Sequence, residues 1–186
     1  MTLNTSTEIR EANGGWTFID TLQTPMGEAV ETTVTDKDSL VIRNRTVKQG
    51  PVSIDTTYEG SKVTGKMSMN GNQQPISVDL GGPAFAEAAG AAFVIGCLDL
   101  KEGYSTVYRN LDLRKQKPKV LQLQVTGSEK VTVPAGAFDT FRVEVKNADD
   151  ASEKATYWIA KDSRTPVKVS ATNPQMNGAT LTAELQ

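Results

Sequence analysis

The sequence contains no histidine and only one cysteine among its 186 residues. Histidine is the commonest general base and a frequent neutral metal ligand, so its absence removes the usual routes to both kinds of site. The single cysteine, Cys97, cannot form an internal disulfide and so does not report the compartment. No apolar run is long and uninterrupted enough to span a membrane. We therefore expect no metal, no cofactor and no transmembrane segment.

The sequence also has no clear excess of positive or of negative charge. The chain has 20 basic and 22 acidic residues and a net charge of -2. A dedicated nucleic-acid-binding domain usually has a clear basic excess, so we expect no nucleic-acid partner. The hydrophobic content of 38% is that of an ordinary globular protein, and the length suits one domain with a real core. We expect a single domain over residues 1–186.

Alternation of apolar and polar residues is the dominant pattern in the sequence. Such a period of two is typical of strands with one buried face and one solvated face. Three alternating runs within residues 51–80 are joined by Gly60-Ser61 and by Asn70-Gly71. Asn-Gly is the preferred pair for a type I′ hairpin turn. The sequence therefore predicts a three-stranded meander over residues 51–80.

Similar short runs recur along the chain and predict about eleven or twelve strands. One segment departs from this pattern, because residues 81–100 are rich in alanine and do not alternate. Pro83 suits the start of a helix, so we expect a helical lid over about residues 83–98. The predicted fold is mainly β: a single large curved antiparallel sheet, a half-barrel or open barrel, with this short Ala-rich helix packed on its concave face.

The stretch VTVPAGAFDTFRVEV, residues 131–145, predicts a strand, a tight corner and a second strand. Pro134 cannot donate a ladder hydrogen bond and Gly136 permits the reversal, while Phe138, out of phase, is expected to pack beneath the corner. Upstream, the alternation would place Glu129 on the apolar face, which is costly for a charge. Either a β-bulge at Gly127-Ser128 resets the register or Glu129 faces a cavity. Glycine within a strand often marks a bulge, which favours the first alternative.

The C-terminal third resembles a family of uncharacterised bacterial exported β-domains. Their pattern is V-x-V-P-A-G-x-F-x-x-F/Y-x-V-E, then a Y/F-W strand, then K/D-D-S-R-x-P-V-K. It is matched here by VTVPAGAFDTFRVE, by Tyr157-Trp158 and by DSRTPVK at residues 162–168. Some members are stand-alone exported proteins and others are trailing modules of larger enzymes. Their architecture is similar to the half-barrel lipoprotein carriers of the LolA and LppX kind. The resemblance implies a fold and a compartment, periplasmic or otherwise extracytoplasmic, but no catalytic residues.

The predicted helix of about sixteen residues would be roughly 24 Å long. It would be too short to cover the whole apolar face of a large sheet. An apolar groove could therefore remain and accept a lipid or another hydrophobic ligand, since flexible methionine suits adaptable binding. The alternative is that the same side chains are ordinary core residues, which is the commoner situation. The candidate ligand-binding residues are Tyr58, Met67, Met69, Phe85 and Phe93.

Other polar clusters give weaker indications. The basic run RNLDLRKQKPKV, residues 109–120, could contact anionic headgroups, but it is more typical of a solvated hairpin tip. Four acidic residues near predicted turns lack the spacing of a calcium-binding loop: Asp149, Asp150, Glu153 and Asp162. No residues form a recognisable catalytic arrangement, so we expect no enzyme.

Two functions remain. The first is a non-enzymatic extracytoplasmic domain that binds a lipid or other hydrophobic ligand. The alternative is an accessory or interaction module trimmed from a larger exported bacterial protein, with a neighbouring domain as its partner and no small-molecule ligand. No signal peptide is visible after Met1, as expected of a chain trimmed at a domain boundary.

Overall fold

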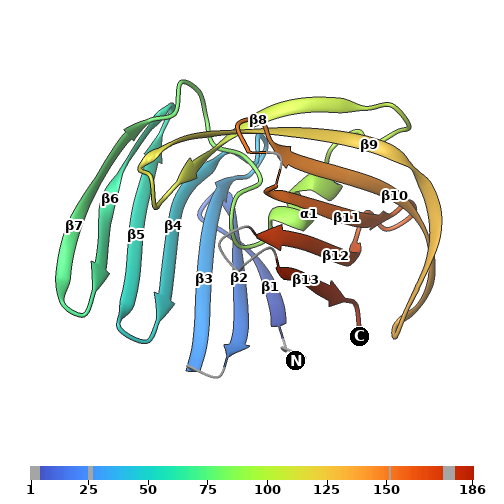
Figure 1. Ribbon diagram of the computed structural model, residues 1–186, viewed down its shortest axis with the longest axis horizontal. Helices are drawn as coiled ribbons and strands as arrows, with labels where there is room; N and C mark the ends of the chain where they lie inside the picture. The colour runs from blue at the N-terminus through green and yellow to red at the C-terminus, as the bar shows by residue number, and fades with distance from the viewer. Residues whose placement is uncertain (1–4, 25–26, 151, 174–178) are drawn as a thin grey trace. The chain divides into compact units, whose positions relative to one another are not determined.

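A computed structural model describes residues 5–24, 27–150, 152–173 and 179–186. Antiparallel strands dominate it, as the alternation predicts (Figure 1). The strands form two sheets, of seven and six strands, whereas a single sheet was expected from the sequence. The chain divides into two compact units, residues 1–91 with 109–118 and residues 92–108 with 119–186. Neither sheet closes into a barrel within the described residues.

The first unit contains the seven-stranded sheet, in which every strand pairs with its neighbours in the chain. This simple order follows from short hairpin links, which allow only antiparallel neighbours. The predicted meander over residues 51–80 is confirmed, and Asn70 and Gly71 both have the positive φ of a type I′ turn, 51° and 82°. The strands are β1 (Thr5–Ala12), β2 (Gly15–Thr24), β3 (Gly27–Asp36), β4 (Ile42–Gln49), β5 (Val52–Glu59), β6 (Lys62–Met69) and β7 (Asn72–Asp79).

One face of this sheet, here called the core face, carries the apolar core of the first unit. Cross-strand neighbours share a face, so the register assigns Tyr58 and Val63 to it together. Residues 80–84 and the end of β8 add further side chains. The buried cluster consists of Ile42, Tyr58, Val63, Ile76, Leu80, Ala84 and Leu111.

The predicted helix over residues 83–98 is wrong for its first half. Helix α1 comprises only Ala91–Gly96. Ala86 and Ala88 have φ values of 47° and 64°, which a right-handed helix cannot contain. Long-range contacts replace the helix here, because the Phe85 amide donates to the Arg109 carbonyl at 3.2 Å. Tertiary contacts therefore override the helical propensity of the alanines.

The second unit contains most of the six-stranded sheet and helix α1, which is the part of the predicted lid that forms. Gly96 ends α1 so close to the second sheet that an added Cβ would lie 2.3 Å from the Arg164 carbonyl oxygen. The sheet follows the order β13-β12-β11-β10-β9-β8. Its strands are β8 (Ser105–Asp112), β9 (Lys117–Val133), β10 (Gly136–Asn147), β11 (Lys154–Ala160), β12 (Pro166–Asn173) and β13 (Ala179–Glu184).

The bulge predicted in β9 is confirmed. Arg142 pairs with Gly127 and Val143 pairs with Val125, so Thr126 is the extra residue. The bulge resets the alternation and leaves Glu129 exposed, where its carboxylate accepts a 2.7 Å hydrogen bond from the Trp158 indole. The cavity alternative for Glu129 is therefore wrong.

The predicted corner between β9 and β10 is also confirmed. Gly136 follows the turn with φ of 133°, and a Cβ built on it would lie 3.8 Å from the Phe138 ring. The ring thus packs beneath the corner, opposite Val131 in the register. This arrangement explains why Phe138 departs from the sequence alternation.

Candidate functional site

The structure separates the five candidate ligand-binding residues. Tyr58 is buried in the core, and Met67 is half-buried against it. Met69 is 52% exposed. Phe85 is half-buried in the segment after β7, and Phe93 is half-buried in α1 of the second unit. Only Tyr58, Met67 and Met69 therefore share the core face of the first sheet.

A continuous row of side chains crosses this face perpendicular to the strands. Asp20 on β2 and Glu31 on β3 begin the row. Val47, Ile54 and Met67 continue it across β4, β5 and β6. Ile54 and Met67 pack against the core cluster, but neither is fully buried. The row is thus acidic over β2–β3 and apolar over β4–β6.

A second row runs beside it, at the edge of the sheet where the β4–β5 and β6–β7 turns lie. Val52 and Met69 are cross-strand partners there, and Val52 is half-buried. Together the two rows form a strip of incompletely covered apolar side chains, here called the apolar strip. It consists of Val47, Val52, Ile54, Met67 and Met69.

A buried ion cluster lies on the same face beside the strip. The Arg45 guanidinium contacts the Glu31 carboxylate at 2.6 Å and the Glu87 carboxylate at 2.8 Å. The exposed fractions are 13% for the Arg45 side chain and 7% for that of Glu87. Burial opposes the positive charge, but Glu31 and Glu87 outweigh it and raise the pKa of Arg45. Arg45 is therefore held in place as a cation between the two acidic side chains.

Glu87 reaches Arg45 from the irregular segment that crosses the core face, residues 81–90. Its second carboxylate oxygen accepts the Leu111 amide at 3.2 Å, so Glu87 joins the segment to both β4 and β8. The two residues that flank it, Ala86 and Ala88, have positive φ. Each such alanine costs roughly 1–2 kcal/mol. The contacts of Glu87 must therefore offset local backbone strain.

The segment has a second attachment at its C-terminal end. The Gly90 amide donates to the Asp20 carboxylate at 3.2 Å, and Thr7 donates to the other oxygen of Asp20 at 2.6 Å. Burial is the main reason that the pKa of Asp20 lies above its ordinary value of 3.8, and the nearby Glu31 carboxylate adds to the effect.

This raised pKa makes a testable contribution to the pH dependence of stability. The folded state binds the Asp20 proton more readily than the unfolded state does. The contribution is therefore complete below the unfolded pKa and is lost as the pH rises through the folded value. The difference in unfolding free energy, wild type minus Asp20→Asn, is expected to fall as the pH rises above about 4. Urea unfolding of both proteins between pH 3.5 and 7 measures it, and a flat or rising difference would contradict the assignment.

Tyr58 lies at the border between the ion cluster and the apolar core. Its hydroxyl is buried beside Arg45 and Thr56 but makes no hydrogen bond of regular geometry. Burial, and then the Glu87 carboxylate, raise its pKa. The phenol therefore stays neutral at ordinary pH and cannot serve as a base.

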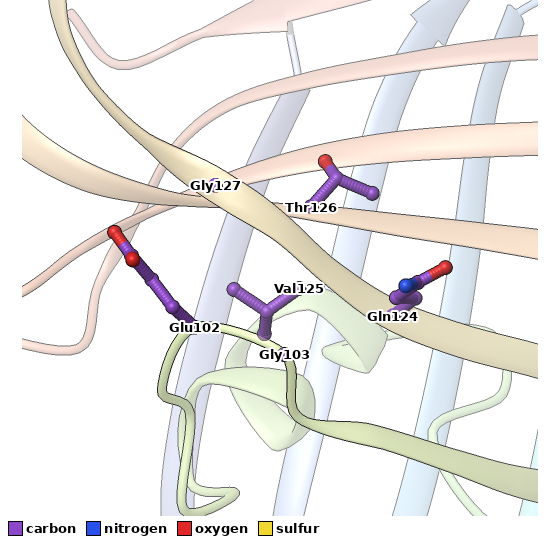
Figure 2. A pocket seen from close by; sticks show the side chains of 6 residues that line it. All are labelled: Glu102, Gly103, Gln124, Val125, Thr126 and Gly127. Carbon is purple, nitrogen blue, oxygen red and sulfur yellow. The ribbon is translucent and has the colours of Figure 1, made fainter.

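A shallow depression of about 480 Å³ is present in the second unit, at the bulge of β9. Glu102 and Gly103 form one wall, and residues 124–127 form the other. Val125 points to the Glu102–Gly103 turn, while Thr126 lies on the opposite side of β9 (Figure 2). The Val125 amide donates to the Tyr104 carbonyl at 2.8 Å and holds the two walls together. Two glycines leave the backbone of this depression accessible.

The other segments considered from the sequence have structural roles. The basic run is confirmed as a hairpin tip, because β8 ends at Asp112 and its carboxylate accepts the Arg114 and Lys115 amides at 3.1 and 3.0 Å. Glu153 pairs with Lys119 at 2.6 Å. Cys97 follows α1 and is exposed. Within the described ranges, no group of three or more acidic or cysteine side chains is arranged to hold a metal ion.

The sequence analysis missed the ion cluster, although two signals for it exist. Asp20 has the same alternation phase as Trp16 and Phe18, so it had to lie on an apolar face. Glu87 is the only charged residue in the apolar run of residues 81–98. A charge in either setting requires a partner. Nothing local to these residues indicates that the partner is Arg45.

Over the described residues, the fold and these features define a two-unit antiparallel β protein with one short helix and an incompletely covered sheet face. The chain belongs to the family described as "Protein of unknown function (DUF3108)", whose model matches residues 2–186. No curated protein and no solved structure matches the chain. In the described part of the chain, no helix is long and apolar enough to cross a membrane.

Proposed function

We propose that this domain binds an aliphatic ligand, without catalysis, on the apolar strip of the first sheet. The observation that carries the proposal is the incomplete cover of Val52, Ile54, Met67 and Met69, which extend the buried core toward the strand ends. Single exposed apolar residues are ordinary, but a contiguous group beside a core is typical of binding surfaces. Two of the side chains are methionines, whose flexible thioethers adapt to irregular ligands.

The shape and charge of the strip favour a flexible, uncharged chain. Neighbouring strands lie about 4.8 Å apart, so the strip extends about 10 Å from β4 to β6. Its side chains are aliphatic or thioether, which suits an acyl chain better than an aromatic ring. At one end, the row reaches the Asp20 and Glu31 carboxylates. An anionic head group beside them would be repelled, so a neutral lipid is the expected ligand class.

The polar groups beside the strip support binding rather than a reaction. Arg45 is held by two carboxylates, and Asp20 accepts two hydrogen bonds. The Tyr58 phenol is kept neutral by burial, which raises its pKa. A general base or nucleophile needs a reactive group that is free to reach a substrate. The proposal is therefore non-enzymatic.

The compartment is part of the same proposal. The VPAG corner, the Tyr157-Trp158 strand and the DSRTPVK segment resemble exported bacterial domains, which supports an extracytoplasmic location. The likeness to half-barrel lipoprotein carriers supports a role in holding a lipid during transfer.

Substitution of Met69 by glutamate tests the site. The neutral probe N-phenyl-1-naphthylamine is expected to bind the wild type saturably, and Met69→Glu is expected to weaken binding at least about tenfold, because a charge then lies in the strip. Met69 is 52% exposed, so the substitution should not disturb the core. Val107→Glu is the matched control, since Val107 is 57% exposed on β8. Fluorescence titration measures all three.

Two results would contradict the proposal. One is the absence of saturable binding by the wild type. The other is an equal loss of binding in Met69→Glu and Val107→Glu, which would place the probe elsewhere. A dansylated fatty acid, which is anionic, should bind more weakly than the neutral probe at pH 7.

A further inference from the structure

Strand β1 forms one edge of the seven-stranded sheet. It pairs with β2 along its whole length, and no described strand pairs with its other side. All eight of its residues are exposed. A proline or a β-bulge commonly protects such an edge from other strands. β7, at the opposite edge of the sheet, contains Pro75, whereas β1 has no proline and pairs with β2 without a shift in register.

The turn between β1 and β2 shows which residues of β1 have free backbone groups. Asn13 and Gly14 have the positive φ of a two-residue type I′ turn, 53° and 69°. Ala12 and Gly15, which flank the turn, are therefore a hydrogen-bonded pair. Hydrogen-bonded and non-hydrogen-bonded pairs alternate along an antiparallel ladder. The N–H and C=O groups that point away from β2 are therefore those of Thr5, Thr7, Ile9 and Glu11.

The charges of β1 are complementary to those of a second copy of the same strand. In an antiparallel pair about a two-fold axis through Ile9, opposite residues are an even number of positions apart, so they share a face. Glu8 of each copy then lies opposite Arg10 of the other. An axis through Glu8 or through Arg10 would instead set that charge opposite its own copy, which is destabilising. The charges therefore favour the axis at Ile9.

We propose that the β1 edge pairs antiparallel with the same edge of a second copy of this chain and forms a two-fold dimer with its axis at Ile9. The paired region runs from Ser6 to Ala12 and is about 24 Å long. Ile9 pairs with Ile9, and Thr7 pairs with Glu11. These residues have the outward backbone groups, so they form the hydrogen-bonded pairs of the new ladder. The two seven-stranded sheets then become continuous across the axis.

The exposure of Ile9 provides a second observation for this register. Ile9 is 41% exposed, although Phe18, its partner on β2, is only 5% exposed. At the axis, the two copies of Ile9 lie opposite each other and cover this apolar surface. β-Branched side chains that face each other across two strands stabilise the pairing. The apolar core face of each sheet therefore extends across the axis.

The ion pairs contribute specificity more than affinity. Arg10 already contacts Glu8 within its own strand, and both side chains are exposed. In the dimer, the four charges alternate in sign around the axis. Exposed ion pairs are weakly stabilising, so the backbone hydrogen bonds and the Ile9 contact supply most of the binding energy. We therefore expect a weak dimer.

Sedimentation velocity of the full chain, from about 1 to about 500 micromolar, tests the proposal. The wild type is expected to shift from monomer to dimer across this range. Ile9→Pro removes the outward N–H at the centre of the new ladder and should raise the dimer dissociation constant at least about tenfold. Gln73→Pro is the matched control and should leave the constant unchanged. It removes an outward N–H from β7, because the Asn70-Gly71 turn makes Asn72 a hydrogen-bonded partner of Met69.

A charge exchange tests the register. Arg10→Glu sets Glu8 of each copy opposite a second carboxylate and should raise the dissociation constant at least about tenfold. The double variant Glu8→Arg, Arg10→Glu exchanges the two charges and should restore the constant to within about threefold. Lys66→Glu also replaces a positive with a negative charge, at an exposed position of β6, and should have no effect.

Circular dichroism confirms that each variant is folded. A wild type that stays monomeric over the whole range would overturn the proposal, and it is the result expected if the charges of β1 only protect the edge. A dimer that Ile9→Pro leaves unchanged, or one that the charge exchange does not restore, would overturn it as well.

Discussion

Replacement of Glu87 by alanine is expected to lower the free energy of unfolding by about 3 kcal/mol or more. The substitution leaves Arg45 buried with only the Glu31 carboxylate, and it removes the acceptor of the Leu111 amide. A buried charge that loses one of its two partners is strongly destabilising, because its desolvation penalty remains while part of the attraction is lost. The strain at Ala86 and Ala88 would also lose the contact that offsets it. Urea denaturation followed by circular dichroism measures the change.

Two control variants show whether the loss of stability arises from the buried ion cluster. Glu87→Gln keeps an oxygen acceptor but removes the charge, so its loss should be smaller than that of Glu87→Ala. Asp99→Ala removes an exposed partner of Lys101, where the side chains are 81% and 70% exposed. Surface pairs contribute little, so the stability should be unchanged within about 0.5 kcal/mol. Equal losses for Glu87→Ala and Asp99→Ala would show that the ion cluster does not hold the segment.

Substitution of Gly90 by alanine is expected to be nearly as damaging, with a loss of roughly 3 kcal/mol. A Cβ on Gly90 would lie 2.2 Å from ring atoms of Phe18, which is itself only 5% exposed. The ring cannot move without displacing the core face. The φ of 75° adds a smaller penalty, because an L side chain rarely adopts it. Urea denaturation of Gly90→Ala beside the wild type measures the loss.

Gly103→Ala separates the steric contribution from the backbone contribution to the destabilisation expected for Gly90→Ala. Gly103 has nearly the same φ, 77°, but a Cβ added to it would meet nothing within 4 Å. Only the backbone penalty of about 1 kcal/mol should remain there. The loss caused by Gly90→Ala should be smaller in a Phe18→Ala background, because that substitution removes both ring atoms that lie 2.2 Å from the new methyl group. Equal losses at Gly90 and Gly103 would indicate that the contact with Phe18 is unimportant.

Much of the local structure could be predicted from short stretches of sequence. The meander over residues 51–80 follows from alternation and from Asn70-Gly71, since both act between near neighbours in the chain. The bulge at Gly127 could be inferred because Glu129 would otherwise lie on an apolar face. Each inference needed only a few adjacent residues and one physical constraint.

The structure brings together only some of the predicted ligand-binding residues. Met67 and Met69 do lie on an incompletely covered face, but Tyr58 is a core residue and Phe93 belongs to the second unit. Period-two alternation shows which residues share a face of one strand. It does not show how far that face is covered, because cover comes from segments distant in the chain.

The strands, their hairpins and the corner at Pro134–Gly136 follow from alternation and turn chemistry, which depend on neighbouring residues. The division into two sheets and the course of residues 81–90 depend instead on contacts between distant parts of the chain. The alanine-rich segment has a good helical propensity, but most of it is irregular. Glu87 forms an ion pair with Arg45, 42 residues away, and Gly90 packs on Phe18. Helix propensities contribute tenths of a kcal/mol per residue, whereas a buried charge without its partner costs several kcal/mol. The contact between Glu87 and Arg45 therefore outweighs the helical propensity of the segment.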